Sequence, residues 1–128
     1  MLTYRKWITR KMLKVEDDTL FVFGDNLIRK GLGGQAKEMR GEPNAVGIPT
    51  KRYPTMKEDA FLSNWDFDEW LEAAKPDIER LKAHKGMIVW PLDGIGSGLA
   101  KLENSAPKIW QYLEELQREL WHLNHTNT

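Results

Sequence analysis

The stretch LFVFGDNLIRKGLGGQAKEMRGEPNAVGIPTK, residues 20–51, decides the fold and points to a binding site. It begins with a short apolar run, residues 20–23, whose aromatic and β-branched side chains predict a buried strand. A glycine-rich segment at residues 31–34 leads into residues 35–40, a string of helix-forming residues that ends at Gly41. Because a strand, a glycine loop and a helix N-terminus together present unpaired backbone N–H groups, this order predicts an anion site. A phosphate-bearing ligand is the first hypothesis, and a purely structural turn is the alternative.

Length and composition are those of a single globular domain. The chain has 128 residues, of which 41% are hydrophobic and 30% charged, so it can bury a core. We expect one domain over residues 1–123 and a frayed tail over residues 124–128. Lys and Arg together number 19, as do Asp and Glu, so the net charge makes a nucleic-acid partner unlikely.

Missing residue types exclude several kinds of site and location. The chain has no cysteine, which excludes disulfides, thiol nucleophiles and thiolate metal sites, and its three histidines show no metal-binding spacing. We therefore expect neither a metal ion nor a cofactor. No apolar run approaches about 20 residues and the N-terminus lacks a signal-peptide core, so we expect a cytoplasmic protein without a membrane partner.

Strands and helices alternate along the rest of the chain. The patterns predict an edge strand over residues 2–8 and further strands over residues 45–49 and 87–91. They predict a helix over residues 10–15, capped by Thr9, and a last helix over residues 105–121. Between them, a helix is expected to begin at Ser63 or Asn64 and to be kinked or split by Pro76. This order predicts an α/β domain with a mixed or partly parallel sheet and helices on both faces.

A second glycine loop, LDGIGSGL at residues 92–99, follows the apolar strand at residues 87–91. If that strand and the one at residues 20–23 are parallel neighbours, both loops open at the same edge of the sheet. They can then hold one extended ligand between them. Two loops of this type support the phosphate hypothesis better than one.

Residues 91–116, PLDGIGSGLAKLENSAPKIWQYLEEL, combine a strand that ends in proline, an Ile-Gly-x-Gly-Leu loop and a helix start. This combination resembles the phosphate-binding loop of the macro domain, in the branch that contains the terminal ADP-ribose protein glycohydrolase and a chromatin-remodeller macro module. The residues that fit the pattern are Pro91, Ile95, Gly96, Gly98, Leu99, Leu102 and Ile109, with Asp25, Gly31, Gly33 and Ala36 in the first stretch. The chain is also similar to small uncharacterised phage and bacterial macro-like proteins.

The resemblance implies a macro-like three-layer α/β/α sandwich with a small mixed sheet. It also implies a pocket for ADP-ribose or a related NAD-derived nucleotide, with an ADP-ribosylated protein as a further partner. Backbone amides of the two loops would hold the diphosphate. The expected ligand-binding residues are Asp25, Asn26, Gly31, Gly33, Gly34, Gly94, Ile95, Gly96, Ser97, Gly98 and Leu99.

Lys51 and Asp93 are the residues expected to carry any catalysis. The segment Ile48-Pro49-Thr50-Lys51 is similar to the Ile-x-Thr-Lys of the glycohydrolase, whose lysine attacks the anomeric carbon of the ribose while an aspartate assists. That aspartate position is Ala100 in this chain, so Asp93 or Asp25 would have to supply the carboxylate. The neighbouring cation Arg52 is expected to help activate Lys51 as a nucleophile. The alternative for Lys51 is a solvated charge or a phosphate clamp without chemistry.

Three residues near the expected ligand edge have two interpretations each. Asp25 can accept hydrogen bonds from an adenine amine or a ribose hydroxyl, or it can end its strand in an Asx turn. Tyr53 and Trp65 can stack on adenine or pack as ordinary aromatic side chains.

The function itself has several alternatives. The first is an ADP-ribosyl hydrolase, and the second is a non-catalytic module that binds or sequesters ADP-ribose. A phosphatase acting on ADP-ribose 1″-phosphate is a third, and it would need a polar group such as Ser97. A phage-type interaction or inhibitor protein is the fourth; it would sequester a signalling nucleotide or bind a host protein, and the absence of any nucleotide binding would favour it.

Overall fold

Four parallel strands form one sheet in a computed structural model that describes residues 1–96 and 100–125. The strands lie in the order β1-β4-β2-β3, with bounds β1 Leu2–Arg5, β4 Ile88–Pro91, β2 Leu20–Asn26 and β3 Ala45–Lys51. β1 is an edge strand, as predicted, and all three strand pairings run parallel. The sheet is therefore parallel rather than mixed, because the antiparallel pairing in the described residues is a single bridge between Lys51 and Phe61.

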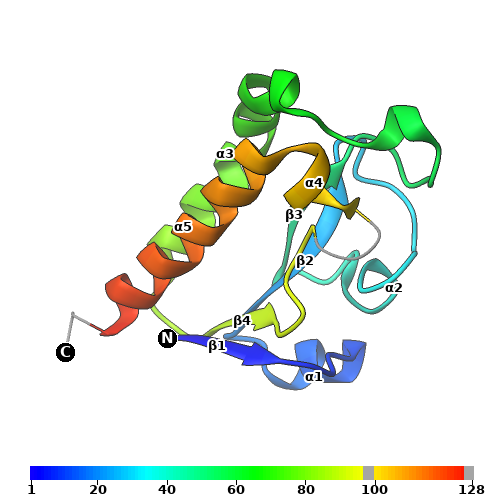
Figure 1. Cartoon of the computed structure of the whole chain (residues 1–128). Coiled ribbons are helices and arrows are strands. Elements are labelled where there is room, and N and C mark those ends of the chain that lie inside the picture. The colour runs from blue at the N-terminus through cyan, green and yellow to red at the C-terminus, as the bar shows by residue number, and fades with distance from the viewer. Residues whose placement is uncertain (97–99, 126–128) are drawn as a thin grey trace.

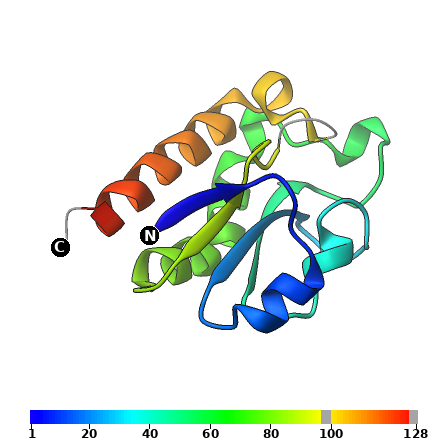
Figure 2. The ribbon, with the colours of Figure 1, turned by 90° about the horizontal axis from the view of Figure 1, so that it is seen from below.

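Helices cover both faces of this sheet. α1 (Arg10–Val15) and α2 (Ala36–Met39) lie on one face, and α3 (Phe67–Ala83) and α5 (Pro107–His125) lie side by side on the other (Figures 1 and 2). The short α4 (Leu102–Ser105) precedes α5, and two 3-10 turns, η1 (Glu58–Ala60) and η2 (Asn64–Asp66), precede α3. These observations confirm an α/β domain with helices on both faces.

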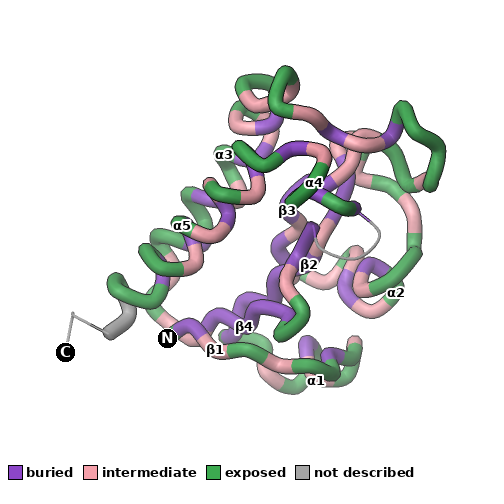
Figure 3. The backbone as a smooth tube through the Cα atoms, viewed as in Figure 1, coloured by how far each residue is buried: buried purple, intermediate pink, exposed green. Residues whose placement is uncertain are grey.

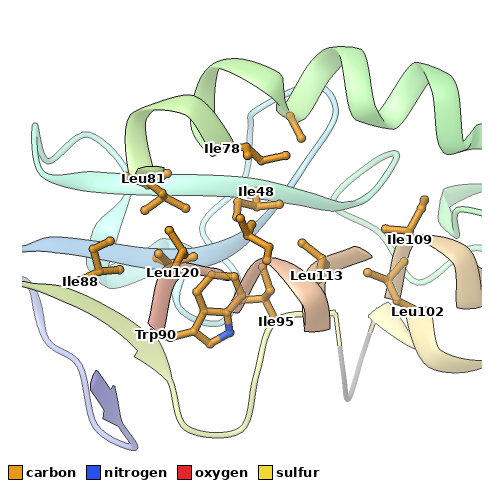
Figure 4. Close-up of a cluster of buried hydrophobic side chains, with 14 of the residues drawn as sticks. Ile48, Ile78, Leu81, Ile88, Trp90, Ile95, Leu102, Ile109, Leu113 and Leu120 are labelled. Atoms are coloured by element: carbon orange, nitrogen blue, oxygen red, sulfur yellow. The ribbon is translucent and has the colours of Figure 1, made fainter. Parts of the chain in front are cut away.

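The alternation of side chains along β2 explains why both faces need cover. Leu20 and Val22 belong to the larger apolar cluster against α3 and α5, whereas Phe21 and Phe23 belong to a second cluster with residues of α1 and α2. Successive side chains of a strand point to opposite faces, so a strand that is apolar throughout must be buried on both. The sheet is accordingly buried along its centre (Figure 3), and the side chains of the larger cluster converge between the sheet and α3 and α5 (Figure 4).

Local signals set the helix bounds, with two corrections. Thr9 caps α1 as predicted, because its side chain accepts a hydrogen bond from the Met12 N–H. Pro76 neither ends nor splits α3, which continues from Phe67 to Ala83. α2 has only four residues, fewer than predicted, so its dipole contributes little. None of the helices in the described part of the chain has the length and apolar character needed to cross a membrane.

The C-terminal end of the domain differs from the prediction. α5 continues through His125, so the first two residues of the expected tail are helical. Residues 126–128 lie outside the described residues, as do Ser97, Gly98 and Leu99 of the second glycine loop.

Candidate functional site

A cleft of about 460 Å³ lies where β2, β3 and β4 end. β2 and β4 are neighbours in the sheet, but the chain runs from β2 to α2 and from β4 to α5, on opposite faces (Figure 1). Connections that leave neighbouring parallel strands in this way diverge and open a crevice, which is where ligands bind in open α/β sheets. The walls of the cleft are residues 24–26, 30–36, 50–51, 54–56 and 94–96, with Arg40 and Ala100.

Both glycine loops line this single cleft, as the sequence predicted. We call residues 30–35 the first glycine loop and residues 92–99 the second. Eight of the expected ligand residues line the cleft: Asp25, Asn26, Gly31, Gly33, Gly34, Gly94, Ile95 and Gly96. The remaining three, Ser97, Gly98 and Leu99, lie outside the described residues.

Arg40 holds the first glycine loop in place through hydrogen bonds to its backbone. Its Nε donates to the Gly31 carbonyl at 2.8 Å and its Nη2 to the Lys30 carbonyl at 3.2 Å. The same guanidinium forms a two-point ion pair with Asp25, in which Nη1 lies 3.2 Å from Oδ2 and Nη2 contacts Oδ1. Asp25 is buried, so this pair fixes the loop to the end of β2 through charge-assisted hydrogen bonds.

The Asp25 carboxylate is therefore largely occupied by the protein. Besides Arg40, its Oδ1 accepts the Asn26 N–H at 2.9 Å, and Arg29 lies 3.7 Å from Oδ2. These contacts favour the interpretation of Asp25 as the structural end of its strand over direct recognition of adenine. Gly47 is required beside it, because a Cβ there would stand 2.7 Å from Asp25 Oδ2.

Asn26 and Arg29 hold the segment between β2 and the first glycine loop. The Asn26 side chain donates to the Lys30 carbonyl at 2.7 Å. Arg29, in the left-handed region at φ 58°, donates to the Gly47 carbonyl at 2.5 Å and pairs with Asp77 of α3 at 2.8 Å. Burial raises the pKa of Asp77, and the nearby Arg29 opposes that rise only in part.

The glycines of the first loop differ in what surrounds them. A Cβ on Gly31 would stand 2.8 Å from Pro54, so the fold itself requires glycine there. Around Gly33 and Gly34, by contrast, an added Cβ would meet no atom within 4 Å, and Gly33 has no positive φ. Among the described residues, the N–H groups of Gly33 and Gly34 also meet no acceptor. Gly33 thus leaves room and a free donor on the cleft wall without any structural need for glycine.

Cations outnumber carboxylates on the cleft wall. Its charged lining residues are Lys30, Arg40 and Lys51 against Asp25 alone. The Lys51 ammonium donates to the Thr55 carbonyl at 3.0 Å, and neither Lys30 nor Lys51 forms an ion pair within the described residues. Their charge is available to an anion in the cleft.

The second expected catalytic residue does not reach the cleft. Asp93 is exposed and does not line it; it lies within a turn that the Gly94 N–H closes by donating to the Pro91 carbonyl at 2.9 Å. Arg52 does not assist Lys51 either, since its guanidinium pairs with Asp66 and Glu69. Tyr53 and Trp65 are exposed, 39% and 96%, and neither lines the cleft.

The sequence did not identify several lining residues, among them the polar residues Lys30, Gln35 and Arg40. Lys30 stands next to the glycine run, which is a signal for a phosphate-binding cation. Gln35 and Arg40 were assigned only to a helix, and no local pattern marks them. No group of three or more His, Cys, Asp or Glu residues in the described part of the chain is placed to hold a metal ion.

Comparison of the sequence with known protein families gives a match that covers the cleft residues. The model of a family of unknown function, DUF7831, matches residues 3–116, which include the four strands from residue 3 onwards and both glycine loops. The chain belongs to the DUF7831 family. Neither a curated protein nor a solved structure matches it.

Proposed function

We propose that this DUF7831 chain binds ADP-ribose or a related NAD-derived nucleotide, with the diphosphate held between the two glycine loops. The observation that carries the proposal is the meeting of both loops in one cleft at the carboxyl ends of neighbouring strands. A volume of about 460 Å³ is of the size that small-molecule sites have in proteins. The resemblance to macro domains supplies ADP-ribose as the first ligand to test, and the macro-like sandwich is part of the same proposal.

The chemistry of the wall supports an anionic ligand. Free N–H groups at Gly33 and Gly34 are donors of the kind that bind phosphate oxygens in loop concavities. Lys30 and Lys51 add two positive charges that no described carboxylate neutralises. A diphosphate supplies acceptors for both kinds of group.

Binding without turnover is the form of the function that the geometry supports. The lysine-and-carboxylate pair of the proposed hydrolase needs a carboxylate beside Lys51, but Asp93 lies outside the cleft and Asp25 is paired with Arg40. The Lys51 ammonium is also engaged as a donor to Thr55. We therefore assign Lys51 to phosphate binding.

Isothermal titration calorimetry with ADP-ribose, ADP, AMP and NAD tests the proposal directly. We expect ADP-ribose to bind with micromolar affinity and more tightly than AMP, because it engages both loops. Absence of heat with all four nucleotides would contradict nucleotide binding and leave an interaction protein as the better hypothesis.

Gly33→Val provides the sharpest variant. A Cβ at this position would meet no protein atom within 4 Å, so the thermal unfolding temperature should stay close to that of the wild type. The same side chain fills the space beside the free N–H groups, so ADP-ribose affinity should fall at least about tenfold, the equivalent of one or two hydrogen bonds. Equal affinity in the folded variant would place the ligand elsewhere.

Lys51→Ala separates phosphate binding from catalysis. As a phosphate-binding cation, Lys51 should contribute roughly tenfold to affinity, with a dependence on salt concentration. Lys57→Ala is the matched control, because Lys57 is an exposed lysine six residues away that does not line the cleft. Turnover of ADP-ribosylated protein by the wild type, abolished in Lys51→Ala, would instead establish a hydrolase.

A further inference from the structure

The side-chain oxygen of Gln35, a residue that lines the cleft, is an unused hydrogen-bond acceptor. Gln35 lines the cleft where the first glycine loop enters α2. Its Oε1 is buried and has no hydrogen-bond partner among the described residues. A buried oxygen without a donor is unfavourable, and such groups in native proteins usually have a ligand or water to explain them.

The other polar side chains on the wall already have hydrogen-bond partners, and the Thr50 hydroxyl donates to the Asp25 carbonyl at 3.1 Å. Asn26 Oδ1 accepts the Lys30 N–H at 3.4 Å, and Thr55 Oγ1 accepts the Lys57 N–H at 3.3 Å. Asp25 accepts from Arg40 and from the backbone. Among the described lining residues, Gln35 is thus the one with a buried side-chain oxygen that has no hydrogen-bond partner.

A phosphate alone cannot satisfy this acceptor. At neutral pH its terminal oxygens are mainly acceptors, which suit the lysines and the free loop N–H groups but not a glutamine oxygen. A sugar hydroxyl can donate to Gln35 while its own oxygen accepts from a neighbouring donor. The terminal torsion of a glutamine side chain is broad, so Oε1 can turn towards such a hydroxyl without a change in the backbone.

We infer that Gln35 determines specificity in this cleft by accepting a hydrogen bond from a sugar hydroxyl of the ligand. The cleft then selects nucleotides that carry a sugar beyond the diphosphate over those that end in phosphate. This inference rests on the proposed nucleotide binding and adds that the sugar beyond the diphosphate is the part of the ligand that Gln35 recognises.

Gln35→Met tests the inference, because methionine is similar in length and shape but accepts hydrogen bonds only weakly. ADP-ribose and ADP share the base and both phosphates and differ in the terminal ribose. We expect the variant to lose about five- to tenfold in affinity for ADP-ribose, the equivalent of one hydrogen bond, with ADP affinity unchanged. Its unfolding temperature should not fall, because the change removes an unpaired acceptor.

Two further variants make the result specific. Leu32→Met alters another cleft-lining side chain without changing any hydrogen bond, so it should keep the wild-type preference for ADP-ribose over ADP. Gln35→Glu keeps the acceptor but adds a negative charge, so both nucleotides should bind more weakly while the preference is retained. If Gln35→Met fails to fold, Gln35→Leu serves in its place, because it also removes the acceptor and should likewise lose the preference for ADP-ribose.

The outcomes distinguish the inference from the function on which it rests. Wild-type protein that binds neither nucleotide overturns both. Wild-type protein that binds both, together with a Gln35→Met variant that keeps the preference or weakens both nucleotides equally, overturns only the role of Gln35.

Discussion

The two glycine loops line the same cleft but are held in place by different forces. The first is fixed by charge, since Arg40 pairs with the buried Asp25 and donates to the carbonyls of Lys30 and Gly31. The described part of the second is fixed by apolar packing, because Ile95 is buried and a Cβ on Gly96 would stand 2.4 Å from a Leu102 methyl group.

The difference shows that a glycine-rich pattern has more than one cause. Gly96 is glycine because its φ is +79° and α4 packs against it. Gly33 has neither constraint and faces open space on the cleft wall. A loop held by polar contacts can leave its glycines free for a ligand, whereas a loop held by packing uses its glycine to build the fold.

The largest expected loss of stability comes from a change in the first glycine loop, which is held by charge. Arg40→Met leaves Asp25 buried with only the more distant Arg29 beside it, which should cost about 3–5 kcal/mol in the free energy of unfolding. Urea denaturation measures this loss. A cost below about 1 kcal/mol would mean that charge does not hold the first glycine loop.

The double variant Arg40→Met with Asp25→Asn is the control for that prediction. It removes the uncompensated charge, so it should be more stable than Arg40→Met alone, and the coupling between the two sites follows from the four-membered cycle. Both variants lack the Arg40 donors to the carbonyls of Lys30 and Gly31, so both should bind nucleotide more weakly than the wild type.

Gly96→Ala, in the second glycine loop, should reduce stability by a somewhat smaller amount. The new methyl group collides with Leu102 and a non-glycine residue is strained at this φ, so we expect a loss of about 2–4 kcal/mol in the free energy of unfolding. Leu102→Ala leaves a cavity of its own, but it removes the colliding atoms, so the loss in the double variant should be smaller than the sum of the two single losses. Additive losses would attribute the cost of Gly96→Ala to the backbone alone.

The smallest expected effect on stability concerns Asp77, which forms an ion pair with Arg29 in the segment that leads into the first glycine loop. Because burial raises its pKa, the folded state binds the Asp77 proton more tightly than the unfolded state does. Its contribution to stability therefore falls as pH rises from the ordinary aspartate value, about 3.9, through the raised value. Compared with Asp77→Asn, the wild type should lose no more than about 1 kcal/mol over this interval in pH-dependent urea denaturation. A gain instead would show that Arg29 outweighs burial.

Local patterns in the sequence were sufficient for most of the elements. The Thr9 cap and the residues of α1 were predicted because their determinants lie within a few positions of one another. The uninterrupted apolar run at residues 20–23 indicated a buried strand, and the two glycine loops indicated one ligand edge. Each of these depends on spacing that can be read directly along the chain.

The use of individual charges in the site could not be predicted in the same way. Asp25 and Arg40 are fifteen residues apart, and their pairing depends on how α2 packs against β2. Arg52 is adjacent to Lys51 in sequence but pairs with η2 and α3 instead. Asp93 is two residues from Pro91, yet it lies in a tight turn and does not line the cleft. Partner choice for long polar side chains is a property of the tertiary structure.

The strand order has a consequence for how the chain acquires its structure. β1 is the first strand in the sequence, but it pairs with β4, so Leu2 can form its strand pairing only once Ile88 is in place. β2 and β3 can associate earlier, because they are adjacent both in the sequence and in the sheet. On a ribosome, the first strand would therefore stay without its partner until most of the domain has been synthesised, and loop closure over such distances slows folding.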